Sequence, residues 1–204
     1  MTIVVVEGIS AAGKTTWCRT HYPEQTTWES PPAAAPVSRD TDPEEAARYW
    51  LERNAERWAA AVEIERRCGI AICDTDPLKL HYAWSLHAIG ELPRESWHVE
   101  QALTREFVAS GRLGFADLVL VNDLPEDVVR QQRNADSTRS RRNFELHVRL
   151  AEPLRRWYHA LETLSPGRVR WQLPAGPLDQ SRLPAPRARR EDPVLLDAVL
   201  ARLG

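Results

Sequence analysis

The sequence predicts a three-layer α/β fold, in which a parallel sheet of about five strands is flanked by helices on both faces. Residues 3–6 are four consecutive β-branched residues, the pattern of a central parallel strand that is buried on both sides. Strand-like and helix-like segments then alternate along the chain, as the crossovers of a parallel sheet require. Glycine or acidic turns follow several of these strands, at the edge of the sheet where this fold class binds ligands.

The length and charge of the chain limit the classes of protein to which it can belong. Its 204 residues are enough for one full domain with a buried core. The 27 Lys and Arg residues nearly balance the 29 Asp and Glu residues, so there is no overall basic field of the kind that nucleic-acid binders carry. Only Lys14 and Lys79 are lysines. Nucleic acid is therefore not an expected partner.

The cysteines and the apolar segments indicate the cellular compartment in which we expect the protein. Cys18, Cys68 and Cys73 have neither metal-binding spacing nor an even count, which is typical of thiols in a reducing compartment. Residues 2–6 are too short for a signal peptide, and no later stretch approaches the length of a membrane span. We expect a cytoplasmic protein without a membrane partner. The sequence leaves open whether the protein forms a homodimer.

The first elements are short. After the strand and a glycine-rich turn, residues 15–20 are expected to form a helix that Pro23 ends, because the residue before a proline is disfavoured in the α region. Residues 25–29 predict a weak second strand. The Pro- and Ala-rich residues 30–38 predict a loop.

A long helix follows, from Pro43 to Cys68. Asp42 is placed as its N-cap, Glu45 completes a capping box, and Gly69 ends the helix. The predicted apolar face consists of residues that recur every three or four positions, namely Ala47, Leu51, Ala55, Trp58 and Val62.

The middle of the chain continues the alternation of strands and helices. Strands are expected over residues 70–73 and 117–121. Helices are expected over residues 77–89, 97–110 and 122–134.

The last third of the chain begins with a polar, arginine-dense segment, residues 135–143. The helix that follows, over residues 144–164, is expected to be kinked or broken at Pro153. Residues 169–173 then predict the last strand, residues 174–191 a Pro- and Arg-rich linker, and residues 192–204 a terminal helix.

The clearest chemistry lies in a glycine loop, Gly8-Ile9-Ser10-Ala11-Ala12-Gly13-Lys14-Thr15. It matches the phosphate-binding P-loop pattern completely and lies between a strand and a helix, where backbone N–H groups bind phosphate oxygens. Lys14 is expected to reach the β- and γ-phosphates, Thr15 to ligate a bridging Mg²⁺ ion and Thr16 to add a further donor. The sequence therefore predicts a three-layer P-loop NTPase fold with ATP and Mg²⁺ as cofactors.

Acidic residues at strand ends are candidates for metal binding and proton transfer. Asp74 is the preferred metal-side carboxylate. Asp76 precedes Pro77 and either shares that chemistry or caps the next helix. Glu29 is the candidate base for an attacking hydroxyl, with an exposed loop glutamate as the alternative.

An arginine series indicates a lid over about residues 133–143. The members of the series are Arg130, Arg133, Arg139, Arg141 and Arg142. Arg139, Arg141 and Arg142 are the candidate catalytic arginines because a mobile loop can deliver their charge to a transferred phosphoryl group, and Arg133 is a candidate nucleotide contact. The alternative is a solvated basic surface or an RNA-facing patch.

Aromatic residues offer candidates for contact with a planar acceptor. Trp28, Trp84 and Trp97 lie near the expected acceptor side, and Tyr82 and His81 are weaker candidates. Trp17, Trp50 and Trp58 are expected in the core.

Residues 6–16, which begin Val6-Glu7-Gly8, resemble the opening of the deoxynucleoside kinases, whose first strand runs into Glu-Gly and a glycine loop of this form. Their second strand ends in a catalytic glutamate followed by proline, and Glu29-Ser30-Pro31 is similar with one residue inserted. The resemblance implies that Glu29 is the base. The segment from Arg139 to Arg142 corresponds in position to the lid of nucleoside and nucleoside monophosphate kinases.

The turn after the third strand departs from that family. Deoxynucleoside kinases usually carry Glu-Arg there, whereas Asp74-Thr75-Asp76 is similar to the motif of ribosylnicotinamide-kinase-like P-loop proteins. Small P-loop kinases of antibiotics share the same layout. The substrate preference of the deoxynucleoside kinases is therefore not transferred.

The sequence as a whole predicts an ATP- and Mg²⁺-dependent phosphotransferase that moves the γ-phosphoryl group to a hydroxyl or phosphate of a small, nucleoside-like acceptor. The alternatives are a nucleotide-hydrolysing regulatory ATPase, or a kinase that acts on an antibiotic or an RNA end. Residues 1–173 are the expected kinase domain, followed by the linker (174–191) and the terminal helix (192–204).

Overall fold

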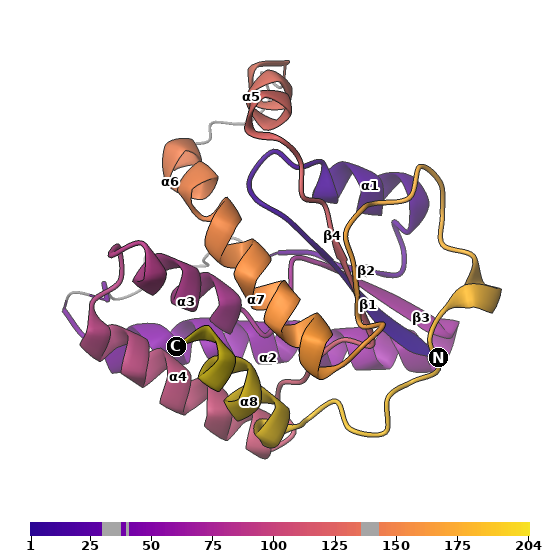
Figure 1. Cartoon of the computed structure of the whole chain (residues 1–204). Coiled ribbons are helices and arrows are strands. Elements are labelled where there is room, and N and C mark those ends of the chain that lie inside the picture. Colours follow the sequence, from indigo (N-terminus) through magenta and orange to yellow (C-terminus); the bar gives the residue numbers. More distant parts are fainter. Residues whose placement is uncertain (30–37, 40, 136–142) are drawn as a thin grey trace.

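The computed structural model describes residues 1–29, 38–39, 41–135 and 143–204. Its centre is a five-stranded sheet in the order β2-β3-β1-β4-β5, in which every pair of neighbours is parallel (Figure 1). The strands are β1 (Thr2–Glu7), β2 (Thr26–Thr27), β3 (Ile70–Asp74), β4 (Leu118–Val121) and β5 (Val169–Arg170). The predicted parallel α/β sheet is confirmed.

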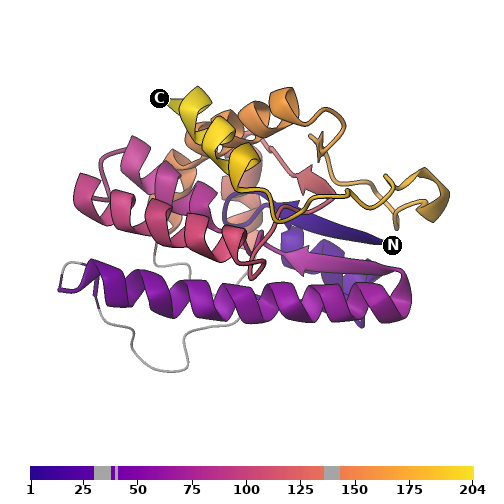
Figure 2. The ribbon, with the colours of Figure 1, turned by 90° about the horizontal axis from the view of Figure 1, so that it is seen from below.

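Helices cover both faces of the sheet. They are α1 (Lys14–His21), α2 (Pro43–Cys68), α3 (Leu80–Ala88), α4 (Arg94–Ala109), α5 (Glu126–Ala135), α6 (Phe144–Arg149), α7 (Ala151–Leu164) and α8 (Pro193–Leu203), with a 3₁₀ turn η1 (Gln180–Arg182). Ile3 and Val5 of β1 belong to one core, with α2, α3, α4, α7 and α8, whereas Val4 and Val6 belong to a smaller core with α1. Figure 2 shows α2 and α4 side by side, the pair of helices that contact each other most. None of the described helices combines the length and the apolar character needed to cross a membrane.

The boundaries of α2 agree with the capping residues in the sequence. Asp42 is the N-cap and accepts a hydrogen bond from Glu45 N at 2.9 Å, and Gly69 ends the helix with a left-handed φ of 78°. The predicted apolar face is buried except at Val62, which is 39% exposed. The prediction is wrong for Val62 alone, because the inward face continues at Ala61, three positions after Trp58 and not four.

The helix after β3 starts later than expected. It begins at Leu80 because its N-cap, Lys79, has a left-handed φ of 53°. Asp76 caps the preceding turn by accepting a hydrogen bond from Leu78 N at 3.0 Å. The alternative that Asp76 caps the helix is therefore wrong.

The break in the helix over residues 144–164 is confirmed, but its position differs. The chain leaves the first helix at Leu150, between α6 and α7, and Pro153 lies inside the first turn of α7. A proline has no N–H to donate and its ring clashes with the carbonyl four residues earlier, here Arg149, so the interruption precedes the proline.

The two edge strands are shorter than the sequence predicts. β2 contains only Thr26 and Thr27 of the predicted residues 25–29, and β5 contains only Val169 and Arg170 of the predicted residues 169–173. Among the described residues, β2 pairs only with β3 and β5 pairs only with β4.

The segment after β5 lies along the body of the protein. Trp17 Nε1 donates to Pro174 O at 2.8 Å, and Leu178 N donates to the Tyr22 hydroxyl at 2.7 Å. Further along, Arg190 forms ion pairs with Glu65 and the fully buried Asp117. α8 then packs on α7 and α4, with Asp192 as its N-cap.

Candidate active site

The glycine loop (residues 8–15) joins β1 to α1 through a compact backbone. Positive φ angles occur at Gly8 (146°), Ala11 (68°) and Gly13 (77°). A Cβ atom on Gly8 would lie 2.8 Å from the carbonyl oxygen of Asn122, which follows β4, so glycine is required there. Asn122 Nδ2 in turn donates to Ala12 O at 2.7 Å. β4 therefore supports the loop at two points.

The loop forms one wall of a cavity of about 620 Å³, a size typical of small-molecule sites. All predicted loop residues line it, namely Gly8, Ile9, Ser10, Ala11, Ala12, Gly13, Lys14, Thr15 and Thr16. The Lys14 ammonium donates to the carbonyl oxygens of Gly8 (2.5 Å) and Ile9 (3.2 Å), so it lies over the loop. The N-terminus of α1 directs its backbone N–H groups toward the same region, which favours an anion.

Thr15 and Asp74 meet at the end of β3. Thr15 Oγ1 donates to Asp74 Oδ2 at 2.8 Å, while Asp74 Oδ1 is buried and has no hydrogen-bond partner among the described residues. Burial raises the pKa of Asp74, and the Thr15 hydroxyl and Lys14 offset this only in part. A hydroxyl oxygen beside a carboxylate with a spare oxygen is the donor set that Mg²⁺ prefers. The residues therefore fit the predicted metal.

The carboxylate and histidine side chains that line the cavity do not gather into a larger metal site among the described residues. Within the described ranges there is no cluster of three or more His, Cys, Asp and Glu side chains that could hold a metal ion. This is consistent with magnesium, which is commonly held by one or two protein oxygens together with phosphates and water.

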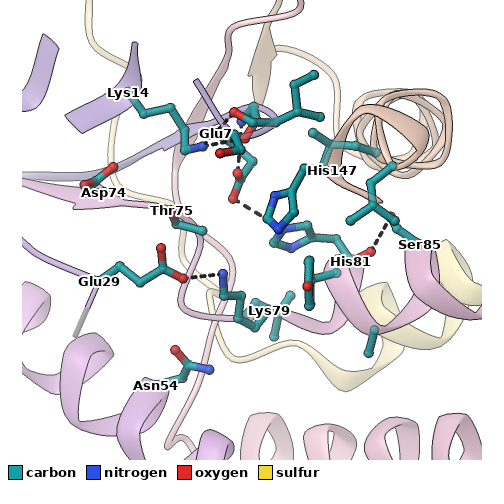
Figure 3. Close-up of a pocket in the computed structure, with 18 of the residues that line it drawn as sticks. Glu7, Lys14, Glu29, Asn54, Asp74, Thr75, Lys79, His81, Ser85 and His147 are labelled. Atoms are coloured by element: carbon teal, nitrogen blue, oxygen red, sulfur yellow. Dashed lines mark hydrogen bonds and ion pairs between the residues drawn. The ribbon is translucent and has the colours of Figure 1, made fainter. Parts of the chain in front are cut away.

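Glu29 lies two residues beyond β2 and lines the cavity. Lys79 Nζ donates to Glu29 Oε1 at 2.7 Å (Figure 3). The Glu29 side chain is 53% exposed, as the alternative of an exposed loop glutamate expects. Desolvation raises the pKa of Glu29, but the ammonium of Lys79 and then the charge of Arg57 lower it, so the net pKa lies below the ordinary value. The sequence singled out Glu29 but gave Lys79 no role, because their contact depends on the left-handed backbone of Lys79.

A buried carboxylate at the end of β1 was also missed. Glu7 accepts hydrogen bonds from Gly8 N (2.9 Å) and Asp76 N (3.0 Å), and its Oε2 lies 3.3 Å from His81 Nε2 (Figure 3). Burial raises the pKa of Glu7, but His81 and the two lysines lower it well below its usual range overall. Tyr158 adds a hydrogen bond to Asp76 at 3.1 Å. A charged residue in an otherwise apolar strand was the available signal in the sequence.

The structure describes only some of the arginines in the predicted series. Arg139, Arg141 and Arg142 lie outside the described residues. Arg133 lies over the ring of Phe144, with 4.8 Å from its guanidinium carbon to the ring centroid, and it does not line the cavity formed by the described residues. Arg130 forms ion pairs with Glu126 and Glu145 on the surface.

The aromatic candidates are partly wrong. Trp84 and Trp97 are 5% and 8% exposed and belong to the core, and Trp28 lies beside Arg19. None of the three lines the cavity within the described part of the chain, whereas Tyr82 and Trp50 do. Trp50, expected in the core, is half-buried. Periodicity along α2 did not reveal its place at the cavity.

The region of the cavity away from the glycine loop is lined by α2, α3, α4 and α6, and we call it the acceptor region. Its polar side chains include Asn54, Glu100 and His147. Arg39 Nε donates to Glu100 Oε1 at 2.9 Å, so this carboxylate is paired. Burial, followed by Lys14 and Lys79, lowers the pKa of His147, which favours its neutral form.

Comparisons with known proteins agree with this geometry at the level of the fold. No protein-family model matches the sequence, and no curated protein sequence matches it. Solved structures do. The chain is similar to deoxyadenosine kinase from M. mycoides with bound dATP, with a TM-score of 0.56 and 11% sequence identity over 88% of this chain and 91% of that one.

Two further structures of the M. mycoides deoxyadenosine kinase match over 98% of both chains. The structure with the products dCMP and a flexible dCDP gives a TM-score of 0.54 at 10% identity, and the one with dCTP gives 0.52 at 11%. The chain thus has the fold of a P-loop kinase. The predicted resemblance to the deoxynucleoside kinases is confirmed in three dimensions, at an identity that shows the fold alone.

Proposed function

We propose that this protein is an ATP- and Mg²⁺-dependent kinase that transfers the γ-phosphoryl group to a hydroxyl of a small, nucleoside-like acceptor. One observation carries the proposal. A complete phosphate-binding loop with its lysine, a Thr15–Asp74 pair and a carboxylate base candidate, Glu29, all line the same cavity of about 620 Å³. The donor and acceptor groups of a phosphoryl transfer can therefore meet there.

At the donor end, the glycine loop and Lys14 neutralise phosphate charge. The loop N–H groups and the N-terminus of α1 hold the β- and γ-phosphates. Lys14 exchanges its two loop carbonyls for phosphate oxygens, which are stronger acceptors because they are charged. These groups are in place before reaction, so they stabilise the charge of the transition state without reorganisation.

Thr15 and Asp74 would hold the magnesium ion, Thr15 through its hydroxyl and Asp74 through its carboxylate. The ion would supply positive charge beside the phosphates, which offsets the negative charge that develops there during transfer. The unpartnered Oδ1 of Asp74 supports this assignment, because a buried carboxylate oxygen without a partner is costly unless a ligand satisfies it.

At the acceptor end, Glu29 takes the proton of the attacking hydroxyl. The acceptor oxygen forms a bond to the γ-phosphorus, the bond from that phosphorus to the ADP oxygen breaks, and ADP leaves. Lys79 keeps Glu29 ionised, which is the form that a base needs. As the proton moves onto Glu29, the ammonium of Lys79 becomes available to the transferred phosphoryl group.

The charges in the acceptor region favour a neutral acceptor over a phosphorylated one. Among the described residues, Lys79 is paired with Glu29, Arg39 with Glu100, and Arg57 with backbone carbonyls. The carboxylates of Glu29 and Glu100 would compete with a second phosphate for Lys79 and Arg39. The fold shared with a deoxyadenosine kinase whose structures contain dATP, dCTP and dCMP also supports a nucleoside-like acceptor.

The test is a screen of acceptors with ATP and Mg²⁺, in which phosphorylated products are identified by mass. The set contains nucleosides, nucleoside monophosphates, ribosylnicotinamide, nucleoside- and aminoglycoside-type antibiotics and a 5′-hydroxyl RNA oligonucleotide. We expect a product from one or more uncharged nucleoside-like compounds. A product from the monophosphates alone would contradict the neutral acceptor, and loss of ATP without any phosphorylated acceptor would favour the hydrolase.

A further inference from the structure

The turn after β3 carries backbone strain. Thr75 has φ of 74°, a left-handed value that is unfavourable for a β-branched residue, and its side chain is buried. Such strain persists only where the surrounding structure holds it, and it is concentrated at functional sites. Thr75 lies directly after Asp74, the metal-side carboxylate of the proposed function. The contacts that hold this turn therefore bear on the position of Asp74.

Two of these contacts involve N–H groups of the turn. Thr75 N donates to Val6 O at 3.0 Å, which extends the pairing of β3 with β1. Asp76 N donates to Glu7 Oε2 at 3.0 Å. Both partners belong to the end of β1, next to the glycine loop.

The carbonyl groups of the turn are held from a different element. Arg57, a buried residue of α2, donates from Nη2 to Asp74 O at 2.7 Å and to Thr75 O at 2.9 Å. Its Nη1 donates to Asn54 Oδ1 at 3.2 Å, one turn earlier on the same helix. The planar guanidinium is therefore fixed on two consecutive carbonyl oxygens of the strained turn.

We propose that Arg57 is a positioning residue that holds the Asp74–Thr75 turn in its strained conformation and thereby fixes the Asp74 carboxylate opposite the Thr15 hydroxyl. This inference rests on the proposed function, since it assigns Arg57 a role at the metal-side carboxylate. Replacement of a side chain that orients a metal ligand without touching the metal commonly changes the metal affinity by about 10–100-fold.

A purely electrostatic role for Arg57 is the alternative. Although burial raises the pKa of Glu29 and Lys79 is the main opposing group, the charge of Arg57 also lowers this pKa. The two roles differ in their dependence on Thr75. Glycine adopts a φ of 74° without the clash of a Cβ atom, so Thr75→Gly removes most of the strain that Arg57 would have to hold.

The experiment measures Mn²⁺ affinity by electron paramagnetic resonance in the presence of a non-hydrolysable ATP analogue, which requires no acceptor. The variants are Arg57→Met, Arg57→Lys, Thr75→Gly and the double variant Arg57→Met/Thr75→Gly. Arg66→Met is the matched control, because Arg66 lies on the same helix and pairs only with exposed Glu63 among its described contacts. Circular dichroism and thermal melts report whether each variant folds.

We expect Arg57→Met to weaken Mn²⁺ binding by about 10–100-fold. Arg57→Lys should lose less, because an ammonium can still donate to one or both carbonyls, and Arg66→Met should match the unsubstituted protein. When Thr75→Gly is already present, the loss caused by Arg57→Met should shrink severalfold. If Arg57→Met alone fails to fold, Arg57→Lys and the double variant carry the comparison.

Two results would overturn the inference while leaving the proposed function intact. One is unchanged Mn²⁺ affinity in Arg57→Met. The other is an equal loss from Arg57→Met in the presence and in the absence of Thr75→Gly, which would show that Arg57 does not act by holding the strained turn. If the unsubstituted protein does not bind Mn²⁺ with the nucleotide analogue, both the proposed function and this inference are wrong.

Discussion

At the scale of single residues, the candidate site depends on the chain's two lysines. Lys14 and Lys79 are the only lysines in the sequence, and both line the cavity. Lys14 lies over the loop carbonyls, whereas Lys79 projects from a left-handed backbone position to pair with Glu29. The proposed function assigns Lys14 to the phosphates, and Lys79 lowers the pKa of the candidate base, although desolvation opposes it.

Replacement of Lys14 by alanine should abolish most of the phosphoryl transfer. The lysine supplies a charged donor to the transferred group, and removal of a donor of this kind typically lowers kcat by about 10²–10³-fold. The rate of product formation, measured by mass with the acceptor found in the screen, tests this expectation. Arg66→Ala, which changes an exposed arginine on α2, is the control, and full turnover by Lys14→Ala would exclude the assigned role.

Replacement of Lys79 by methionine should shift the acidic limb of the pH–rate profile to higher pH. Lys79 lowers the pKa of Glu29, although burial opposes it, so its removal raises that pKa. The transfer rate falls as pH drops through the pKa of the base, because the protonated carboxyl cannot accept a proton. The fall should therefore begin at higher pH in the variant.

The control for this profile is Glu29→Gln, which should remove the limb and depress the transfer rate more than ATP binding. A Glu29→Gln variant with an unchanged rate and limb would move the base to Asp74 or Asp76. An unshifted limb in Lys79→Met alone would show that Lys79 does not set the ionisation of Glu29.

At the scale of elements, the glycine loop is held between three strands and one helix. β1 leads into it, α1 continues from it, and the residue after β4, Asn122, contacts the backbone at both Gly8 and Ala12. β3 adds Asp74 through Thr15. The parallel sheet brings these strand ends to one edge, which explains why the site forms there.

Gly8→Ala should destabilise the protein by about 1–3 kcal/mol and weaken nucleotide binding, because an added Cβ would clash with the carbonyl of Asn122 at a φ that alanine rarely adopts. Urea denaturation and nucleotide titration measure the two effects. Gly176→Ala is the matched control, because its Cβ would meet nothing within 4 Å. Equal stability of the two variants would contradict the close approach of β4.

At the scale of the whole molecule, the C-terminal segment is joined to the base of the sheet by a buried charge network. Arg190 Nη1 donates to Glu65 Oε2 at 2.7 Å, and its Nε donates to Asp117 Oδ1 at 3.1 Å. Asp117 also accepts from Ile3 N at 2.8 Å. The network connects α2, the start of β1 and the segment after β5, three parts that lie far apart in the sequence.

Arg190→Ala should destabilise the protein by about 3–5 kcal/mol, because it leaves the charges of Asp117 and Glu65 buried without their cation. Thermal or urea unfolding measures the loss. Arg182→Ala, at an exposed arginine of the same segment, should change the stability little. If the two variants have the same stability, the segment is not held by this network.

The sequence by itself determined the features that depend on neighbours in the chain. The glycine loop is recognisable because its function needs a fixed spacing of residues 8–15, and α2 because Asp42, Glu45 and Gly69 act within one turn of its ends. The order of strands and helices followed from the same local patterns. Where local patterns weaken, at the edge strands and in the helix broken before Pro153, the predicted bounds were inaccurate.

Only the tertiary structure decided which side chains meet. Thr15 and Asp74 are 59 positions apart in the sequence. Lys79 reaches Glu29 because the backbone of Lys79 is left-handed, a conformation that the sequence does not predict. Glu7 and Arg57 looked like ordinary members of a strand and a helix. Periodicity and capping act over a few residues, whereas such contacts depend on how whole elements pack, so the donor half of the site was predictable and most of the acceptor half was not.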